Sequence, residues 1–500
     1  MTAMSPFRSM PRLRWLLAYL LLLLASHAVA SWLSRTSRPL PEQKTIAVQV
    51  ADAPRPVTLA YVDRPATNAG APVVLLLHGS PARAYDLRAF AEALGGGVRV
   101  IAPDLPGFGS SSRSAPDYSI RAAAAYLEAL LDTLAIERVH VVGFSLGGGA
   151  ALHLHERDPA RVESLTLLAS IGVQELELLG SHTLNRGLHG AQLALLWSAA
   201  NLLPHFGALD RVLFNVPYAR SFYDTDQRPL RGLLERFEPP MLILHGAEDP
   251  LVPPAAAREH HRIVPQSEWI ELPGAHFHAY SEPERIAGLV LDFVERVERG
   301  EAATRPQAAP VRVEAAAVPF RDVERKAASG LALWLILFLI CFSTLISEDL
   351  ACIGAGLLVA HGLLEFWHAA GAAFASLFGG DILLYAAGRY IGRPALRRAP
   401  FRWFVRDQAI QDSAEWFARR GPIVILASRF VPGSRLPTYF TAGLLHQNFW
   451  SYLLFFCVAG VIWAPFLVWL AATLGERALD LLHEYKAYTL GGLVLVALLL

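Results

Sequence analysis

The chain has 500 residues, long enough for two or three domains. Lysine plus arginine and aspartate plus glutamate each number 44, so the formal net charge of zero argues against a nucleic-acid-binding protein. Hydrophobic residues make up 53% and the mean hydropathy is +0.34, which predicts membrane-spanning segments. The three cysteines, Cys341, Cys352 and Cys457, lie in apolar C-terminal stretches, so no disulfide framework is expected.

An apolar segment follows a short basic beginning of the chain. Three arginines within residues 8–14 precede Trp15 to Ala30, which is nearly all leucine and alanine. This is the arrangement of a signal sequence, and Ala28-Val29-Ala30 offers a small-residue cleavage site. We therefore assign residues 1–33 as a signal peptide or a signal anchor. In both cases the next domain is delivered to the outer side of the membrane.

Residues 45–298 have the composition of a soluble α/β protein. Short apolar runs alternate with helix-compatible stretches, which predicts a mostly parallel sheet with helices on both faces. The expected strands are, in chain order, 73–77, 98–102, 139–142, 165–169, 241–245 and 269–272. Ligands bind such sheets at the carboxyl ends of the strands, so functional residues are expected directly after these runs.

The strand at 139–142 leads into Gly143-Phe144-Ser145-Leu146-Gly147, a G-x-S-x-G pattern, and a helix-compatible stretch begins at once. In a sharp strand-to-helix turn, a Cβ at the flanking glycine positions would collide with neighbouring backbone. The turn lifts the Ser145 hydroxyl clear of the sheet, at the positive end of the following helix. The pattern alone also fits a glycine-rich turn that happens to contain serine, so catalytic partners are required.

Two later strands end in residues suited to activate a serine. Gly-Ala-Glu-Asp-Pro at 246–250 follows one strand, and Pro-Gly-Ala-His-Phe-His at 273–278 follows the last one. A serine hydroxyl needs a general base such as neutral imidazole, and the imidazole needs a carboxylate to fix its tautomer. The order serine, aspartate, histidine is that of α/β-hydrolases. With these motifs, residues from about 50 to 298 resemble an α/β-hydrolase-fold serine hydrolase.

The resemblance implies a role for each residue. Ser145 would be the nucleophile, His276 the base and Asp249 the orienting acid. Glu248 is the rival for the acid, but the G-x-x-D pattern of the family favours Asp249. His278 is the rival for the base, but the position after Gly-Ala favours His276.

Two backbone N–H groups, of Ser80 and Leu146, would form the oxyanion hole, whereas Pro81 has no N–H to offer. A serine nucleophile argues against epoxide hydrolases and haloalkane dehalogenases, which resemble this domain but use aspartate. The expected chemistry is cleavage of ester, thioester or amide bonds through an acyl-enzyme, with no cofactor and no metal.

Two segments of this half are defined by composition. Residues 171–235 form an insertion rich in leucine and aromatic residues, which in this family is a lid over the site. We expect an apolar or lipid-like acyl substrate, although the aromatic residues would equally serve as the lid's own core. Residues 299–328 are rich in alanine, proline, arginine and glutamate with no period, and are expected to be a linker.

Long apolar stretches dominate beyond residue 331, and they contain charged residues. Charges at membrane depth are costly enough to suggest function, and the helix breakers around them predict re-entrant loops. Ala-Gly-Leu-Leu occurs both at 355–358 and at 442–445, and two broken segments at matching positions indicate an inverted-repeat transporter. The predicted second domain is therefore an all-α polytopic membrane domain.

Four motifs in this region are more specific: S-E-D-L, A-G-L-L-x-x-H-G, G-G-D-x-x-x-Y-x-x-G-R-x-x-G and R-F-V-P-G-S-R. They resemble the DedA, or SNARE-associated (VTT), membrane family over residues 331–480. The resemblance implies movement of lipids between leaflets. The positions that match the family's functional charges are Glu348, Asp349, Asp381, Arg429 and Arg435. These charges would alternatively form internal salt bridges.

The predicted topology leaves one disagreement. Six arginines between residues 389 and 406 place that loop in the cytoplasm, and counting back tends to place residue 330 inside, whereas the N-terminal arginines place the hydrolase domain outside. We expect a bacterial inner-membrane protein with a periplasmic hydrolase domain, membrane lipids as partners and a further apolar segment at 487–500. The alternative function is a lipid transporter whose hydrolase-like domain binds ligand without catalysis.

Overall fold

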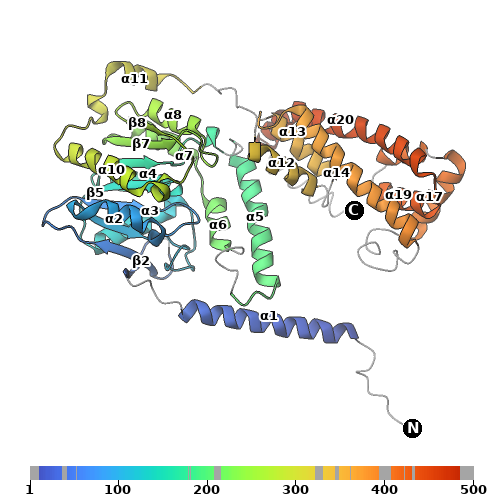
Figure 1. Ribbon diagram of the computed structural model, residues 1–500, viewed down its shortest axis with the longest axis horizontal. Helices are drawn as coiled ribbons and strands as arrows, with labels where there is room; N and C mark the ends of the chain where they lie inside the picture. The colour runs from blue at the N-terminus through green and yellow to red at the C-terminus, as the bar shows by residue number, and fades with distance from the viewer. Residues whose placement is uncertain are drawn as a thin grey trace, which may run out of the picture. The chain divides into compact units, whose positions relative to one another are not determined.

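The computed structural model describes residues 11–36, 42–51, 53–177, 180, 182–207, 215–320, 330–343, 348–360, 362–392, 407–421, 423–430 and 434–484. The chain divides into two compact units, residues 1–320 and 321–500. The first unit contains a β-sheet with helices around it, and the described part of the second is helical (Figure 1). The apolar segment predicted at 487–500 lies outside the described residues.

The first unit is built on an eight-stranded sheet with the order β1-β2-β4-β3-β5-β6-β7-β8. The strands are β1 Gln43–Val48, β2 Val57–Arg64, β3 Val73–Leu77, β4 Arg99–Pro103, β5 Val139–Phe144, β6 Val162–Leu168, β7 Met241–Gly246 and β8 Glu268–Leu272. From β4 to β8 all neighbours are parallel, which confirms the predicted α/β fold. The antiparallel strands β1 and β2 at one edge were not among the predicted ones.

The sheet separates two hydrophobic cores. Along β3, Leu75 and Leu77 pack in one core and Val74 and Leu76 in the other, because successive side chains of a strand point to opposite faces. Helices α3 (Ile120–Thr133), α4 (Leu146–Arg157) and α8 (Pro254–Ile263) cover the first face, and α2 (Arg88–Ala93) and α10 (Pro283–Glu298) cover the second. Each fully buried leucine contributes about 1.5–3 kcal/mol to folding.

Helices fill the insertion between β6 and β7. They are η4 Gln174–Leu176, α5 His182–Leu202, α6 Val216–Asp224 and α7 Arg228–Arg236. Asn215 caps α6 by accepting a hydrogen bond from the backbone N–H of Tyr218 at 3.3 Å. α5 packs along α6, and these two helices lie beside the carboxyl ends of the strands (Figure 1). The leucines of α7 instead join the core on the first face of the sheet.

The segment expected to be a linker is partly folded. Residues 305–307 form the turn η5 (Arg305–Gln307), and α11 (Pro310–Ala317) packs against α8. Arg262 of α8 donates hydrogen bonds to the carbonyl oxygens of Ala315 (2.7 Å) and Val318 (2.8 Å). The prediction failed here because guanidinium groups hold the segment to the domain, and such contacts leave no apolar period in the sequence. Residues 321–328 lie outside the described residues.

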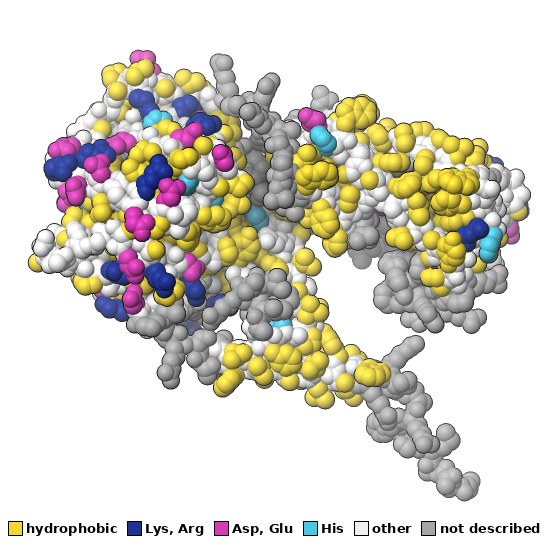
Figure 2. Space-filling model, viewed as in Figure 1, with side chains coloured by type: hydrophobic (Ala, Val, Ile, Leu, Met, Phe, Trp, Pro, Cys, Tyr) yellow, Lys and Arg dark blue, Asp and Glu magenta, His cyan; other side chains and the backbone are white. Residues whose placement is uncertain are grey.

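The described part of the second unit consists of mostly apolar helices, one polar helix at 407–420 and short helical turns, and hydrophobic side chains cover much of its visible surface (Figure 2). The helices and turns described in this unit are α12 Gly330–Ser343, α13 Glu348–Ala360, α14 Phe366–Ala386, the π-helical turn η6 Ala387–Ile391, α17 Asp407–Arg420, α18 Ile423–Ala427, η7 Ser428–Phe430, α19 Arg435–Leu444 and α20 Phe449–Glu484. Among the described residues, 366–391 and 449–474 here, and 15–33 of α1 (Pro11–Thr36) in the first unit, are long and apolar enough to cross a membrane. α13 and α19 are shorter than a membrane span.

The repeated Ala-Gly-Leu-Leu sequence marks two close helix contacts. A Cβ on Gly356 would lie 2.5 Å from the carbonyl oxygen of Val468 in α20, and a Cβ on Gly443 would lie 2.0 Å from that of Tyr385 in α14. Each glycine therefore lets the backbone of its short helix approach a longer one, as small residues do in membrane bundles. The repeat thus has a packing role in both halves of this unit.

Candidate functional site

Ser145 lies in the turn between β5 and α4. Its backbone has φ 53° and ψ −118°, outside the regions that non-glycine residues ordinarily adopt. A Cβ on Gly143 would lie 2.5 Å from the Cα atom of Gly148, and a Cβ on Gly147 would lie 2.7 Å from the carbonyl oxygen of Leu77. The predicted need for both glycines is confirmed, and the turn holds Ser145 at the carboxyl ends of the central strands.

The loop after β3 lies directly against this turn. A Cβ on Gly79 would lie 2.8 Å from the Cβ of Ser145. The fully buried His78 accepts a hydrogen bond at Nε2 from the backbone N–H of Leu105 (2.9 Å), so its Nδ1–H donates to the carbonyl of Gly79 (2.6 Å). Burial lowers the pKa of His78, which keeps the ring neutral for these bonds. His78 thereby fixes the loop that carries Ser80.

His276 and Asp249 form a buried pair after β8 and β7. The Nδ1–H group of His276 donates to Oδ2 of Asp249 at 2.6 Å, and Oδ1 of Asp249 accepts from the backbone N–H groups of Leu251 (2.8 Å) and Val252 (3.0 Å). Burial opposes ionisation of Asp249, but the hydrogen bond from His276 and the backbone donors outweigh it and lower the pKa of the carboxyl. An ionised Asp249 places the proton on Nδ1 and leaves Nε2 of His276 as a base.

Ser145, His276 and Ser80 line one cavity of about 340 Å³ between the strand ends and the insertion. This volume is within the usual range for small-molecule sites. In the described part of the chain, no hydrogen bond joins Ser145 to His276. Such contacts commonly tighten only when substrate binds. The backbone N–H of Leu146, as the first residue of α4, has no acceptor within the helix.

The two rival residues lie elsewhere. Glu248 is exposed to solvent, although it is adjacent to Asp249 in the chain. His278 is buried at the beginning of α9 (His278–Ser281), where its Nδ1 lies 3.3 Å from a carboxylate oxygen of Glu282. The structure therefore brings Ser145, Asp249 and His276 together and leaves both rivals out.

Glu177 was missed by the sequence reasoning. It follows η4 in the insertion, is 5% exposed and lines the same cavity as Ser145. Its Oε1 accepts a hydrogen bond from the backbone N–H of Gly172 at 2.6 Å. Burial nevertheless raises the pKa of Glu177 to about 8. Nothing in the alternation of glutamate and leucine at 175–179 distinguishes this buried carboxyl from an exposed one.

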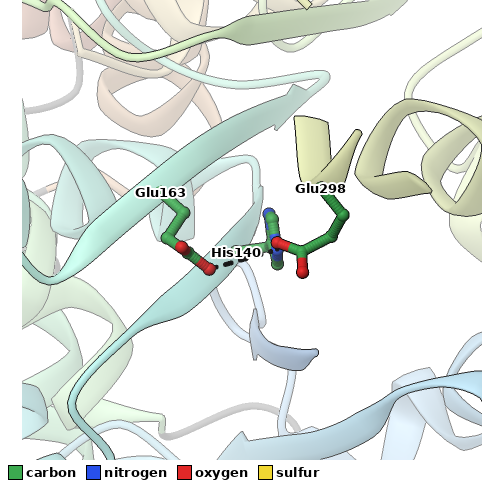
Figure 3. Close-up of side chains that lie close together, drawn as sticks. All are labelled: His140, Glu163 and Glu298. Carbon is green, nitrogen blue, oxygen red and sulfur yellow. Dashed lines mark hydrogen bonds and ion pairs between the residues drawn. The ribbon is translucent and has the colours of Figure 1, made fainter. Parts of the chain in front are cut away.

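One group among the described residues could hold a metal ion, and it lies at the other end of the sheet. The ligand atoms of His140, Glu163 and Glu298 are within 4.8 Å of one another, near the amino ends of β5 and β6 (Figure 3). Nε2 of His140 lies 3.1 Å from Glu298 and 3.4 Å from Glu163, and Glu163 is also paired with Arg138. These polar groups satisfy one another, and we assign no metal to them.

The second unit contains a cluster of charges in which Asp381 and Arg429 are buried and Glu348 and Arg435 are partly exposed. Nη2 of Arg429 lies 2.6 Å from Oδ2 of Asp381, and Nη1 of Arg429 lies 3.7 Å from Oε2 of Glu348. Arg435 forms an ion pair with the same oxygen of Glu348. The structure thus joins four of the five predicted charges, which come from α13, α14, η7 and α19. Asp349 is separate and accepts a hydrogen bond from Nε1 of Trp463 at 3.4 Å.

Two family models match the chain. The description of one is "alpha/beta hydrolase fold", over residues 72–189, and the other is the VTT domain, over residues 352–473. The first range contains the turn with Ser145 but ends before Asp249 and His276. The second contains Asp381, Arg429 and Arg435 but begins after Glu348 and Asp349.

Curated relatives resemble the first unit. A 2-hydroxymuconate semialdehyde hydrolase of Pseudomonas putida is 31% identical, over 40% of this chain and 78% of its own length. A pimeloyl-[acyl-carrier protein] methyl ester esterase of Neisseria meningitidis is 30% identical, over 45% of this chain and 94% of its own length. The solved structure of a thermophilic esterase from Thermogutta terrifontis superposes with a TM-score of 0.41 and 21% identity, covering 51% of this chain and 99% of that one.

Proposed function

The chain belongs to the α/β-hydrolase fold family and carries a VTT domain, and on this premise we propose that it is a membrane-bound serine hydrolase of acyl bonds joined to a lipid-translocating domain. The main support for the hydrolase function is that His276, bonded to Asp249 at 2.6 Å, lines the same cavity as the strained Ser145. The name of one relative, a methyl ester esterase, supports an ester as the substrate class.

In the proposed mechanism, Oγ of Ser145 attacks the carbonyl carbon of the acyl bond while Nε2 of His276 takes its proton. The ionised Asp249 stabilises the imidazolium that forms. The backbone N–H groups of Ser80 and Leu146 would stabilise the oxyanion, and one such donor is typically worth about 10²–10³ in rate. His276 then protonates the leaving group, and a water activated by the same imidazole releases the acyl group.

The cavity fits an acyl substrate of moderate size. Phe144, Phe277 and Tyr280 line it beside the proposed nucleophile, and Tyr218 and Phe222 line it from α6. Aromatic side chains of this kind bury apolar groups and favour an apolar acyl chain. We therefore propose an apolar or lipid-like ester, with no cofactor.

The test is labelling of the full chain in membranes by a fluorophosphonate probe. Labelling is expected for the unaltered protein and for His278→Ala, and is expected to be lost in Ser145→Ala and His276→Ala. His278 is the matched control because it is a buried histidine two residues away that pairs with Glu282 instead. Absence of labelling in the folded, unaltered chain would favour the alternative of a non-catalytic, ligand-binding domain.

For the membrane half, the ion-pair cluster supports movement of lipids between leaflets. Arg429 and Asp381 are buried among apolar helices, where a charge is retained only at a considerable free-energy cost. We further propose that both halves act on one lipid-like substrate. In vesicles, Arg429→Gln should slow transfer of a labelled lipid between leaflets, whereas Asp349→Asn should not. Equal rates for Arg429→Gln and the unaltered chain would leave the VTT domain as an anchor only.

For the location we propose the bacterial inner membrane with the hydrolase domain on the periplasmic side. The support is the basic N-terminal flank of the apolar helix α1 and the candidate spans at 366–391 and 449–474. A cysteine-reactive, membrane-impermeant label on an added cysteine in α11 would test it. Labelling of intact spheroplasts is expected, and labelling only after lysis would reverse the orientation.

A further inference from the structure

Helix α5 of the insertion has two unlike faces. His182, Asn185 and His189, spaced as neighbours on one helix face, line the catalytic cavity. Leu188, Leu195 and Leu202 follow one another at intervals of seven on another face and are 42%, 69% and 54% exposed. A helix over an active site in water normally places its polar face outward. In α5 the polar face lines the cavity instead, and the leucines face outward.

The C-terminal end of α5 is satisfied by the protein rather than by water. The last four carbonyl groups of a helix have no partner within it. In α5 each of these four carbonyl groups accepts a hydrogen bond. The carbonyl of residue 199 accepts from the backbone N–H of Leu203 (3.0 Å), and that of residue 200 accepts from Nε2 of His205 (2.9 Å). The carbonyl of residue 201 accepts from Nε2 of His27 (3.1 Å), and that of residue 202 accepts from the hydroxyl of Tyr19. Two of these donors belong to α1. Complete internal partnering is what a helix end requires when it lies in lipid.

Ser26 of α1 joins the two helices further. Its side chain is fully buried, whereas most of the described side chains of α1 are exposed and apolar. Its Oγ accepts hydrogen bonds from the backbone N–H groups of His205 (2.9 Å) and Phe206 (2.8 Å). A Cβ on Gly207 would lie only 3.1 Å from the Cα of Ala30. The candidate membrane span is therefore bonded to the end of the helix that covers the cavity. Hydrophobic side chains gather along α1 and the adjoining part of α5 (Figure 2).

We propose that the outer face of α5 docks on the lipid bilayer that holds α1, and that α1 is retained as an anchor so that the cavity takes its acyl substrate from the bilayer. The occupant is lipid because the exposed leucines of α5 continue the surface of a helix long and apolar enough to span a membrane. The part concerning substrate entry rests on the proposed hydrolase function.

The first test places an environment-sensitive fluorophore on Leu195→Cys in the full chain, with the three native cysteines replaced by serine. The protein is reconstituted in phosphatidylethanolamine–phosphatidylglycerol vesicles that contain nitroxide-labelled lipid. The control is Val311→Cys on α11, because Val311 is also 69% exposed. Blue-shifted emission quenched by the nitroxide is expected at 195 and not at 311. Water-like emission at 195 would overturn the proposal, and so would a blue shift without quenching, which indicates a protein cover such as a second copy.

The second test compares Leu195→Glu with Val311→Glu in the chain that retains its three cysteines. A long-chain ester embedded in the vesicles and a water-soluble short-chain ester are offered separately. Leu195→Glu should lower the rate on the embedded ester at least tenfold and leave the rate on the soluble ester unchanged, and Val311→Glu should alter neither. No cleavage of either ester by the unaltered chain would contradict the hydrolase function itself. Equal rates of Leu195→Glu and the unaltered chain on the embedded ester would contradict only the docking.

A separate measurement tests whether the mature protein retains α1. Mass spectrometry of the purified chain should find peptides from residues 15–33. A mature chain that begins at Ser31 would lack Tyr19, Ser26 and His27, and would therefore overturn the anchoring of α5.

Discussion

The buried carboxyl of Glu177 makes the stability of the hydrolase domain depend on pH. Burial raises its folded-state pKa to about 8, from an ordinary value of 4.5. The folded state therefore holds this proton in a range where the unfolded state has released it, and stability falls as the pH rises from about 4.5 to about 8. At pH 8 the free energy of unfolding is lower than at acidic pH by at most roughly 5 kcal/mol.

Glu177→Gln keeps an oxygen that can accept the N–H of Gly172 and removes the titration. We expect similar melting temperatures for the variant and the unaltered chain at pH 5, and a melting temperature for the variant higher by roughly 10 °C at pH 8. Intrinsic fluorescence of the detergent-solubilised full chain measures both. Glu175→Gln is the control, since Glu175 is partly exposed and paired with Arg231 at 3.0 Å. An equal difference in melting temperature between the two chains at both pH values would contradict a raised pKa of Glu177, because it would mean that the carboxyl is ionised in the folded state at pH 5 as well as at pH 8.

Substitutions in both units should change activity or stability in defined ways. Asp249→Asn should lower kcat on a soluble ester by about 10⁴, because the amide favours the wrong tautomer of His276. Glu248→Gln should retain nearly full activity, and a comparable loss in that variant would contradict the assignment of Asp249 as the orienting acid. Gly147→Ala should destabilise the domain by about 2 kcal/mol or more in denaturant unfolding, since its Cβ meets backbone at 2.7 Å, and an unchanged midpoint would contradict the packing. Asp381→Asn should destabilise the membrane unit by about 3 kcal/mol, because the buried Arg429 loses its charged partner at 2.6 Å and keeps only Glu348 at 3.7 Å. Thermal aggregation in detergent measures this, and an unchanged transition would contradict it.

The parts of the structure that local sequence determines were predicted well. Around Ser145, β-branched residues favour a strand, and the flanking glycines are required because a Cβ at either position would collide with neighbouring backbone. The parallel strands were found because each is a short apolar run. β1 was missed because half of its side chains are exposed, and its pairing with β2 is a contact that its own sequence does not specify.

Contacts between distant residues could not be predicted. The motifs named Glu348, Asp349, Asp381, Arg429 and Arg435, but only the packing shows that Arg429 meets Asp381 while Asp349 meets Trp463. The same limit applies to the bond between Ser26 and the end of α5. These pairs join segments that lie 48 to 180 residues apart in the chain.

If Ser145 is a nucleophile activated by His276, a serine-directed reagent should modify Ser145 only when His276 is present. The full chain in membranes is treated with a fluorophosphonate, digested and mapped by mass spectrometry. The phosphonyl adduct is expected on Ser145, in the peptide that contains the turn between β5 and α4, and is expected to be absent in His276→Ala. An adduct on another serine, or undiminished labelling of Ser145 in His276→Ala, would show that Ser145 is not a nucleophile activated by His276.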